Sequence, residues 1–127
     1  MMENFLIINC IGKNDKLGLR INKEFFVHTF KEKENVNEKL VQETFDFLEQ
    51  HKVELNEKFS VIVNQGPGSF SGIRISLAIA KGLEISKKVR LYGYIDNDLQ
   101  NFDLKNIEKL IDENLTEKNL IKPIYLS

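Results

Sequence analysis

The most specific residue spacing in this chain lies between positions 65 and 75, where three glycines and a proline precede an arginine. The stretch reads Gln65-Gly66-Pro67-Gly68-Ser69-Phe70-Ser71-Gly72-Ile73-Arg74-Ile75. It follows a β-branched apolar run and leads into an apolar helical pattern, so the backbone must turn sharply between a strand and a helix. Such a loop either presents a helix N-terminus to an anion or brings two backbones close together.

Neither common nucleotide-binding loop matches this stretch. A Walker A loop counted from Gly66 would need a glycine followed by lysine at positions 71 and 72, where the chain has serine and glycine. The dinucleotide fingerprint would also need its third glycine at position 71. Anion binding at the helix N-terminus therefore remains one interpretation, and its candidate residues are Gly66, Pro67, Gly68, Ser69, Phe70, Ser71, Gly72 and Arg74.

The helix after the loop favours the other interpretation, close approach of two elements. Gly72, Ser76 and Ala80 lie four residues apart and give this helix one edge of small side chains. Ala78 and Gly82 form a second small pair. A chain of this size should not need both edges internally, so we predict that one of them meets a helix of another molecule. The expected interface residues are Leu40, Val41, Thr44, Phe47, Gly72, Ile73, Ser76 and Ala80.

Composition predicts one soluble cytoplasmic domain. The 127 residues suffice for a single core, and 18 basic against 19 acidic residues create no strong field toward nucleic acid or membrane. One cysteine gives no disulfide framework and fits a reducing compartment. The apolar run near the N-terminus is too short for a secretory leader or a membrane span.

Hydrophobic periodicity predicts a mixed α/β sheet with helices packed on it, in the order β-β-β-α-β-α-β. The expected strands cover residues 5–10, 17–21, 24–30, 59–63 and 89–95, with a last extended piece at 123–126. The first expected helix starts near residue 35, with Asn35 or Asn37 as its N-cap. Two further helices are expected over residues 71–86 and 103–115. Residues 96–102 are expected to form a turn or a short helical step. This order is typical of ribonuclease H-like and actin-like half-domains.

The stretch from Gly66 to Ile75, continued by Leu77-Ala78-Ile79-Ala80-Lys81-Gly82-Leu83, closely resembles the signature of the TsaB (YeaZ) family, which often carries a glycoprotease or peptidase label. Weaker agreement extends to residues 5–10 and 121–126. The resemblance implies an actin-like fold and membership of the complex that makes threonylcarbamoyladenosine on tRNA. It implies a non-catalytic subunit that partners TsaD, with TsaE as the associated ATPase.

The chain also departs from that family. The family's first strand usually ends in Asp and a hydroxyl residue, where this chain has Asn9 and Cys10. A family His-Ser pair at the start of the first long helix falls on Val36 and Asn37. The family is usually longer, so we expect residues 1–127 to form a single actin-like domain in which residues 96–122 replace most of a second domain.

Residues for other chemistry are sparse. Metal-dependent peptidase activity would need clustered ligands, whereas His28 and His51 are the only histidines and fall on a strand and at a helix end. Cys10 ends an apolar strand and is expected to be a buried structural thiol. An actin-like ATPase would need acidic residues at the phosphate strands and a second lobe. We therefore expect no catalytic residue, no metal and no cofactor.

A local basic cluster lies between residues 66 and 90. Its basic members are Arg74, Lys81, Lys87, Lys88 and Arg90, against one acid, Glu84. These charges could meet tRNA phosphates or an acidic patch of a partner. Because no aromatic residue was expected to interleave with them as base stacking requires, any contact with tRNA is expected to be indirect.

The sequence predicts a non-catalytic, dimerising subunit of the threonylcarbamoyladenosine machinery. Its two long helices are expected to bind a TsaD-like catalytic subunit, or a second copy of this chain when TsaD is absent, with a TsaE-like ATPase as a further partner. The alternative is a small phosphate- or nucleotide-binding hydrolase centred on the loop from Gly66 to Gly72 and on Arg74.

Overall fold

A mixed sheet of six strands organises the part of the chain that the structure describes. This part, in the computed structural model, comprises residues 3–31, 36–117 and 121–124. The strands are β1 (Phe5–Asn9), β2 (Lys16–Ile21), β3 (Glu24–Thr29), β4 (Ser60–Asn64), β5 (Arg90–Tyr94) and β6 (Thr116–Glu117), in the spatial order β3-β2-β1-β4-β5-β6. The helices are α1 (Val36–Gln50), α2 (Phe70–Lys87) and α3 (Leu104–Glu113), with a short 3₁₀ helix, η1, at Asp96–Asp98.

The sheet joins an antiparallel meander to a parallel core. β1, β2 and β3 pair antiparallel, with Ile7 opposite Gly18 and Gly18 opposite Val27. β4 lies parallel to β1 and to β5, and the helices α1 and α2 make the crossovers that parallel pairing requires. β6 adds a short antiparallel edge through Tyr92 and Gly93.

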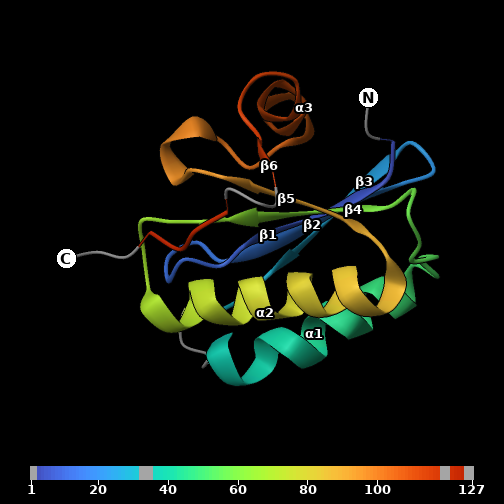
Figure 1. Cartoon of the computed structure of the whole chain (residues 1–127), viewed down its shortest axis with the longest axis horizontal. Coiled ribbons are helices and arrows are strands. Elements are labelled where there is room, and N and C mark those ends of the chain that lie inside the picture. The colour runs from blue at the N-terminus through green and yellow to red at the C-terminus, as the bar shows by residue number, and fades with distance from the viewer. Residues whose placement is uncertain (1–2, 32–35, 118–120, 125–127) are drawn as a thin grey trace.

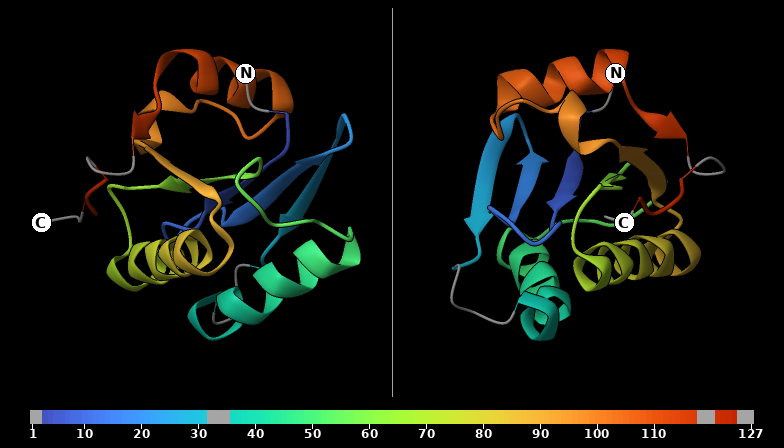
Figure 2. Two further views of the ribbon diagram at one scale, coloured as in Figure 1. Left: turned by 45° about the vertical axis from the view of Figure 1, so that its right-hand side comes forward. Right: turned by 90° about the vertical axis from the view of Figure 1, so that its left-hand side faces the viewer.

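Helices cover both faces of the sheet, as Figures 1 and 2 show. α1 and α2 lie side by side on one face, and α3 lies on the other. Leu6 and Ile8 of β1 point into the larger core under α1 and α2, whereas Phe5 and Ile7 point into the smaller core under α3. This alternation follows from the two-residue period of a strand, and it explains why β1 and β4 read as continuous apolar runs.

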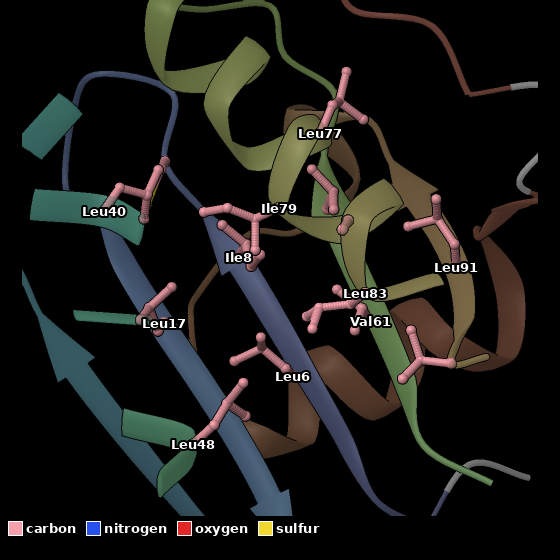
Figure 3. Packing of buried hydrophobic residues seen from close by; sticks show 14 of the residues in the cluster. Leu6, Ile8, Leu17, Leu40, Leu48, Val61, Leu77, Ile79, Leu83 and Leu91 are labelled. Carbon is pink, nitrogen blue, oxygen red and sulfur yellow. The ribbon is translucent and has the colours of Figure 1, made fainter. Parts of the chain in front are cut away.

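The larger core fills the space between the sheet and the two long helices. Figure 3 shows side chains of several strands and of both helices converging there, and its labelled members include Leu17, Leu40, Val61, Leu77 and Leu91. All five are buried within the chain. α1 and α2 therefore rest on a packed hydrophobic layer. Burial of its apolar side chains accounts for most of the stabilisation of this face of the sheet.

The predicted fold class and element order are confirmed, with the helix and strand ends mostly displaced by a residue or two. The short step expected at residues 96–102 is η1 followed by bends. β6 was not predicted, because two residues carry too short a pattern to be read. The extended piece expected at 123–126 is not a strand over its described residues, although Ile124 N–H donates to Gln65 O at 2.7 Å; residues 125–126 lie outside the described part.

The expected N-cap of the first long helix needs correction. Asn37 is the second residue of α1, and its side-chain amide donates to Ser71 Oγ at 2.7 Å. It therefore ties the start of α1 to the start of α2. The other candidate, Asn35, lies outside the described residues.

Within the described ranges, no helix is long and apolar enough to cross a membrane.

We expect Ile107→Ala to lower the free energy of unfolding by about 2 to 5 kcal/mol, because Ile107 of α3 is fully buried in the smaller core and its truncation leaves a cavity. Ile85→Ala removes an isoleucine that is 73% exposed on α2 and should change stability by less than about 0.5 kcal/mol. Urea denaturation of both variants measures the difference. Equal effects would show that α3 does not cover the sheet as described.

Candidate functional site

The glycine loop packs against the backbone that follows β1. A Cβ atom on Gly68 would lie 2.5 Å from Ile11 Cβ and 2.6 Å from Ile11 O, and one on Gly72 would lie 2.6 Å from Cys10 O. Ser69 N–H donates to Ile11 O at 2.6 Å. A side chain larger than hydrogen cannot occupy either position without displacing backbone, so these two glycines permit close approach of two chain segments.

The start of the loop is also packed closely against other parts of the chain. Gly66 has a φ of 106°, which is the left-handed region that favours glycine, and its missing Cβ would meet Ile124 O and Ile73 Cδ1. Its N–H donates to Asn64 Oδ1 at 2.9 Å, and its carbonyl accepts from Asp96 N–H at 2.9 Å. Protein groups therefore surround this glycine, as they surround the other two.

Arg74, the charged member of the predicted anion site, faces a different neighbour. Its guanidinium carbon lies 4.9 Å from the centre of the Phe70 ring, and both side chains are exposed. Among the described residues, no side-chain hydrogen bond joins Arg74 to the glycine loop. Ser71 accepts from Asn37, and Pro67 is half-buried. The geometry thus favours the close-approach interpretation of the loop over an anion cradle.

Most of the residues predicted for a partner interface are buried inside the chain itself. Ser76 and Ala80 are 1% and 0% exposed, and Ser76 Oγ donates to Gly72 O at 2.7 Å. They cannot set the approach of an external helix, so that prediction is wrong. The small edge allows α2 to settle into the interior of its own chain. The seven buried members are Leu40, Thr44, Phe47, Gly72, Ile73, Ser76 and Ala80.

Val41, the eighth predicted member, stays exposed and lies on an apolar groove between α1 and α2. The groove encloses about 520 Å³. Val41 is 48% exposed and Phe45 is 42% exposed. The second small pair, Ala78 and Gly82, contributes to it from α2. Its full lining is Val41, Phe45, Ile75, Ala78, Ile79, Gly82, Leu83, Ser86 and Lys87. We call this surface the helix groove; contiguous exposed apolar surface of this kind marks interaction sites.

The two helices that form the helix groove carry opposite net charges. α1 carries four acidic residues against one lysine: Glu38, Glu43, Asp46 and Glu49 against Lys39. α2 carries three basic residues against one acid: Arg74, Lys81 and Lys87 against Glu84. Lys87 belongs to the lining of the groove, whereas Glu43 lies 3.0 Å from His28 of β3.

A polar network closes the carboxyl ends of the parallel strands. Asn64 Nδ2 donates to Asn9 Oδ1 at 2.6 Å and to Asp96 Oδ1 at 3.1 Å, and Tyr94 Oη donates to Asn9 Oδ1 at 3.0 Å. Burial, followed by the nearby charge of Asp96, raises the pKa of the Tyr94 hydroxyl well above its ordinary value. Tyr94 therefore stays a neutral donor, and these groups satisfy one another at the ends of the strands.

Cys10 has the environment of a structural thiol. Its side chain is buried, and burial together with the Asp15 carboxylate raises the pKa of the thiol far above its ordinary value. Because only the thiolate is a strong nucleophile, this cysteine is unsuited to covalent catalysis at neutral pH.

Both histidines lie at the contact between β3 and α1. His28 Nε2 lies 3.0 Å from Glu43 Oε1, and His51 stacks on Phe26 with the ring centres 4.1 Å apart. Phe47 lies between the two imidazole rings, 5.7 Å and 5.2 Å from them. No group of three His, Cys, Asp or Glu side chains suited to a metal occurs in the described part of the chain.

Comparison with known proteins finds partial sequence matches to one kind of protein. No family model matches the chain. The chain is 45% identical over 40 residues to the tRNA threonylcarbamoyladenosine biosynthesis protein TsaB of Buchnera aphidicola subsp. Baizongia pistaciae, which covers 32% of this chain and 18% of that protein. It is 30% identical over 86 residues to the TsaB protein of the subspecies Acyrthosiphon pisum, covering 66% and 39% respectively. The matches thus span well under half the length of these relatives.

Solved structures show the same fold at greater coverage. YeaZ from Pseudomonas aeruginosa superposes with a TM-score of 0.68 at 18% identity, over 88% of this chain and 50% of that one. A protein described as having similarity to peptidase YEAZ, also from Pseudomonas aeruginosa, gives a TM-score of 0.65 over 88% of this chain and 49% of its own. The predicted mixed α/β fold is therefore confirmed as the fold of about half of the YeaZ chain.

Two helical glycines of α2 provide a matched test of the close approach. We expect Gly72→Ala to destabilise the protein by about 1 to 3 kcal/mol, because the new methyl group would press on the Cys10 carbonyl. Gly82 has no atom within 4 Å of its missing Cβ, so Gly82→Ala should stabilise by about 1 kcal/mol through helix propensity. Thermal unfolding of both variants measures the contrast. If Gly72→Ala is neutral, glycine is not required at that contact.

Proposed function

We propose that this chain belongs to the TsaB (YeaZ) family and acts as a non-catalytic subunit in the biosynthesis of threonylcarbamoyladenosine on tRNA. Its curated relatives carry that biosynthetic role in their names. The observation that carries the proposal is the helix groove, an exposed apolar surface between α1 and α2. A surface of this kind serves binding, and in this role the chain works in the cytoplasm.

The helix groove is the proposed docking site for a TsaD-like catalytic subunit. Val41 and Phe45 on α1 face the groove together with Ala78 and Gly82 on α2, so a partner helix could lie close to α2 while it buries the larger side chains of α1. A TsaE-like ATPase would join the assembly through this pair of subunits. Residues 1–127 would act as a single unit in it.

A second copy of the chain is the proposed occupant when the catalytic subunit is absent. In a two-fold arrangement, the acidic α1 of one copy can face the basic α2 of the other, and the same contact then occurs twice. The charge distribution therefore supports an isologous pair as well as a heterologous partner with a similar division of charge.

The chemistry of the remaining polar groups agrees with a supporting role. Cys10 is a buried protonated thiol, and Asn9, Asn64 and Tyr94 are neutral groups that hydrogen-bond one another. A hydrolase based on the glycine loop has no comparable support, because protein groups pack against Gly66, Gly68 and Gly72.

We expect the double variant Phe45→Glu/Ala78→Glu to weaken association with a TsaD-like subunit more than about tenfold, because docking would bury two unpaired charges. Both residues are exposed, so the variant should fold with an unchanged melting temperature. Ile85→Glu places the same charge on α2 outside the groove and serves as the control. Affinity capture with purified TsaD, followed by light scattering of the chain alone, measures both associations. Retained capture by the double variant would place the interface elsewhere.

The pathway role requires its own measurement. Cells or a reconstituted system that lack the native TsaB should regain threonylcarbamoyladenosine on tRNA when this chain is added together with the matching TsaD and TsaE, as read by mass spectrometry of tRNA nucleosides. The groove variant should fail in the same system. Capture of TsaD without restored modification would restrict the chain to binding and contradict the proposed role in biosynthesis.

A further inference from the structure

We infer that the solvent-facing side of α2 binds a single-stranded segment of RNA. This inference rests on the proposed function, since tRNA is the nucleic acid that such a subunit would meet, and it adds a direct contact to that function. It involves a surface distinct from the helix groove. The residues that carry it are Phe70, Arg74, Lys81, Lys88, Arg90 and Tyr92.

Basic side chains form one line along α2 and into β5. Arg74 and Lys81 are exposed and lie seven residues apart on α2, and seven residues are close to two helical turns, so the two share a face and are separated by roughly 10 Å along the helix axis. Lys88 is also exposed and follows the last residue of the helix, where the backbone turns with a φ of 64°. Arg90 is also exposed and begins β5 two residues later. We call this set the basic line.

The basic line contrasts with the rest of the chain. Residues 66–90 carry five basic side chains and one acidic side chain, whereas the whole chain has a formal net charge of −1. The positive charge is therefore concentrated on this element. An extended polyanion is the ligand class that such a row of point charges attracts.

An aromatic platform stands at the first end of the basic line. Phe70 is 54% exposed, and the Arg74 guanidinium lies 4.9 Å from its ring centre. Sequence spacing alone did not reveal this pair, because Phe70 precedes the charged residues instead of alternating with them. Nucleobases stack on aromatic rings and on guanidinium planes, so the pair offers a base-stacking surface beside the phosphate-binding charges.

A hollow of about 650 Å³ lies at the other end of the line, beside the first half of β5. Lys88, Arg90 and Tyr92 line it together with the apolar side chain of Ile85. Glu84 and Glu117 also line the hollow, and the Glu117 carboxylate can accept a hydrogen bond from a base amino group. The hollow is large enough for a nucleotide, within the usual range of about 300 to 1,000 Å³ for ligand sites.

These features favour RNA over an acidic polypeptide. A polypeptide of aspartate and glutamate would use the charges of Lys81 and Lys88 but would gain nothing from the exposed ring of Phe70. A single strand of RNA uses both, because its phosphates follow the basic line and its unpaired bases stack at the platform. The separation of charge contacts from stacking contacts makes the inference testable by two kinds of variant.

The test measures binding of the whole chain to a fluorescent single-stranded RNA of about ten nucleotides by anisotropy, between about 50 and about 200 mM salt. Lys81→Glu/Lys88→Glu should lower affinity at least about tenfold and reduce the salt dependence by about 0.7 per lost phosphate contact. Phe70→Ala should lower affinity about tenfold with the salt dependence unchanged, because it removes stacking only. Lys105→Glu/Lys109→Glu makes the same charge change on exposed positions of α3 and should bind as the parent does.

The outcomes separate the inference from the proposed function. TsaD capture should be retained by the basic-line variant, and RNA binding should be retained by Phe45→Glu/Ala78→Glu. If the parent chain captures TsaD but does not bind the RNA, the inference is overturned and the proposed function stands. The inference is equally overturned if the α3 control weakens binding as much as the basic-line variant does. The surface would be assigned to an acidic polypeptide if polyglutamate displaces the labelled RNA as strongly as unlabelled RNA does and if Phe70→Ala leaves the affinity unchanged.

Discussion

The arrangement of this molecule depends on one close backbone contact, the approach of the glycine loop to the segment that follows β1. Ser69 N–H donates to Ile11 O, and Gly68 and Gly72 leave no room for a side chain against Ile11 and Cys10. This contact fixes where α2 starts relative to β1 and therefore how the helix lies on the sheet. Only glycine allows two backbones to pack at this distance, so the loop composition follows from the packing requirement.

The position of α2 determines which of its edges remains available for binding. Its small edge turns inward, where Ser76 and Ala80 are buried next to the large apolar residues of the core. The opposite small pair, Ala78 and Gly82, then lies at the surface beside Val41 and forms the helix groove. The charged residues of α2 are left on its solvent side, which is where the basic line lies. The way in which α2 packs on the sheet thus determines both its core residues and its surface residues.

The carboxyl ends of the parallel strands are often where ligands bind in open α/β sheets. In this chain neutral side chains occupy part of that position: Asn9 accepts hydrogen bonds from Asn64 and from Tyr94, and Asn64 also reaches Asp96. Mutual hydrogen bonding lowers the free-energy cost of burying these polar groups. The network consequently stabilises the junction between β1, β4 and the loop after β5.

Local patterns in the sequence were enough to predict most of the helices and strands and their order. Strand and helix periods in segments such as Phe5–Asn9 and Phe70–Lys87 are local properties, and the run from Gly66 to Leu83 is specific enough to indicate a resemblance to TsaB-like proteins. Which face of each helix is buried depends on how the elements pack together in the folded chain. Ser76 and Ala80 read as a binding edge because small residues suit both a core and an interface, and the choice depends on long-range packing that no local period records. For the same reason, the stacking of Arg74 on Phe70 became visible only once α2 was placed.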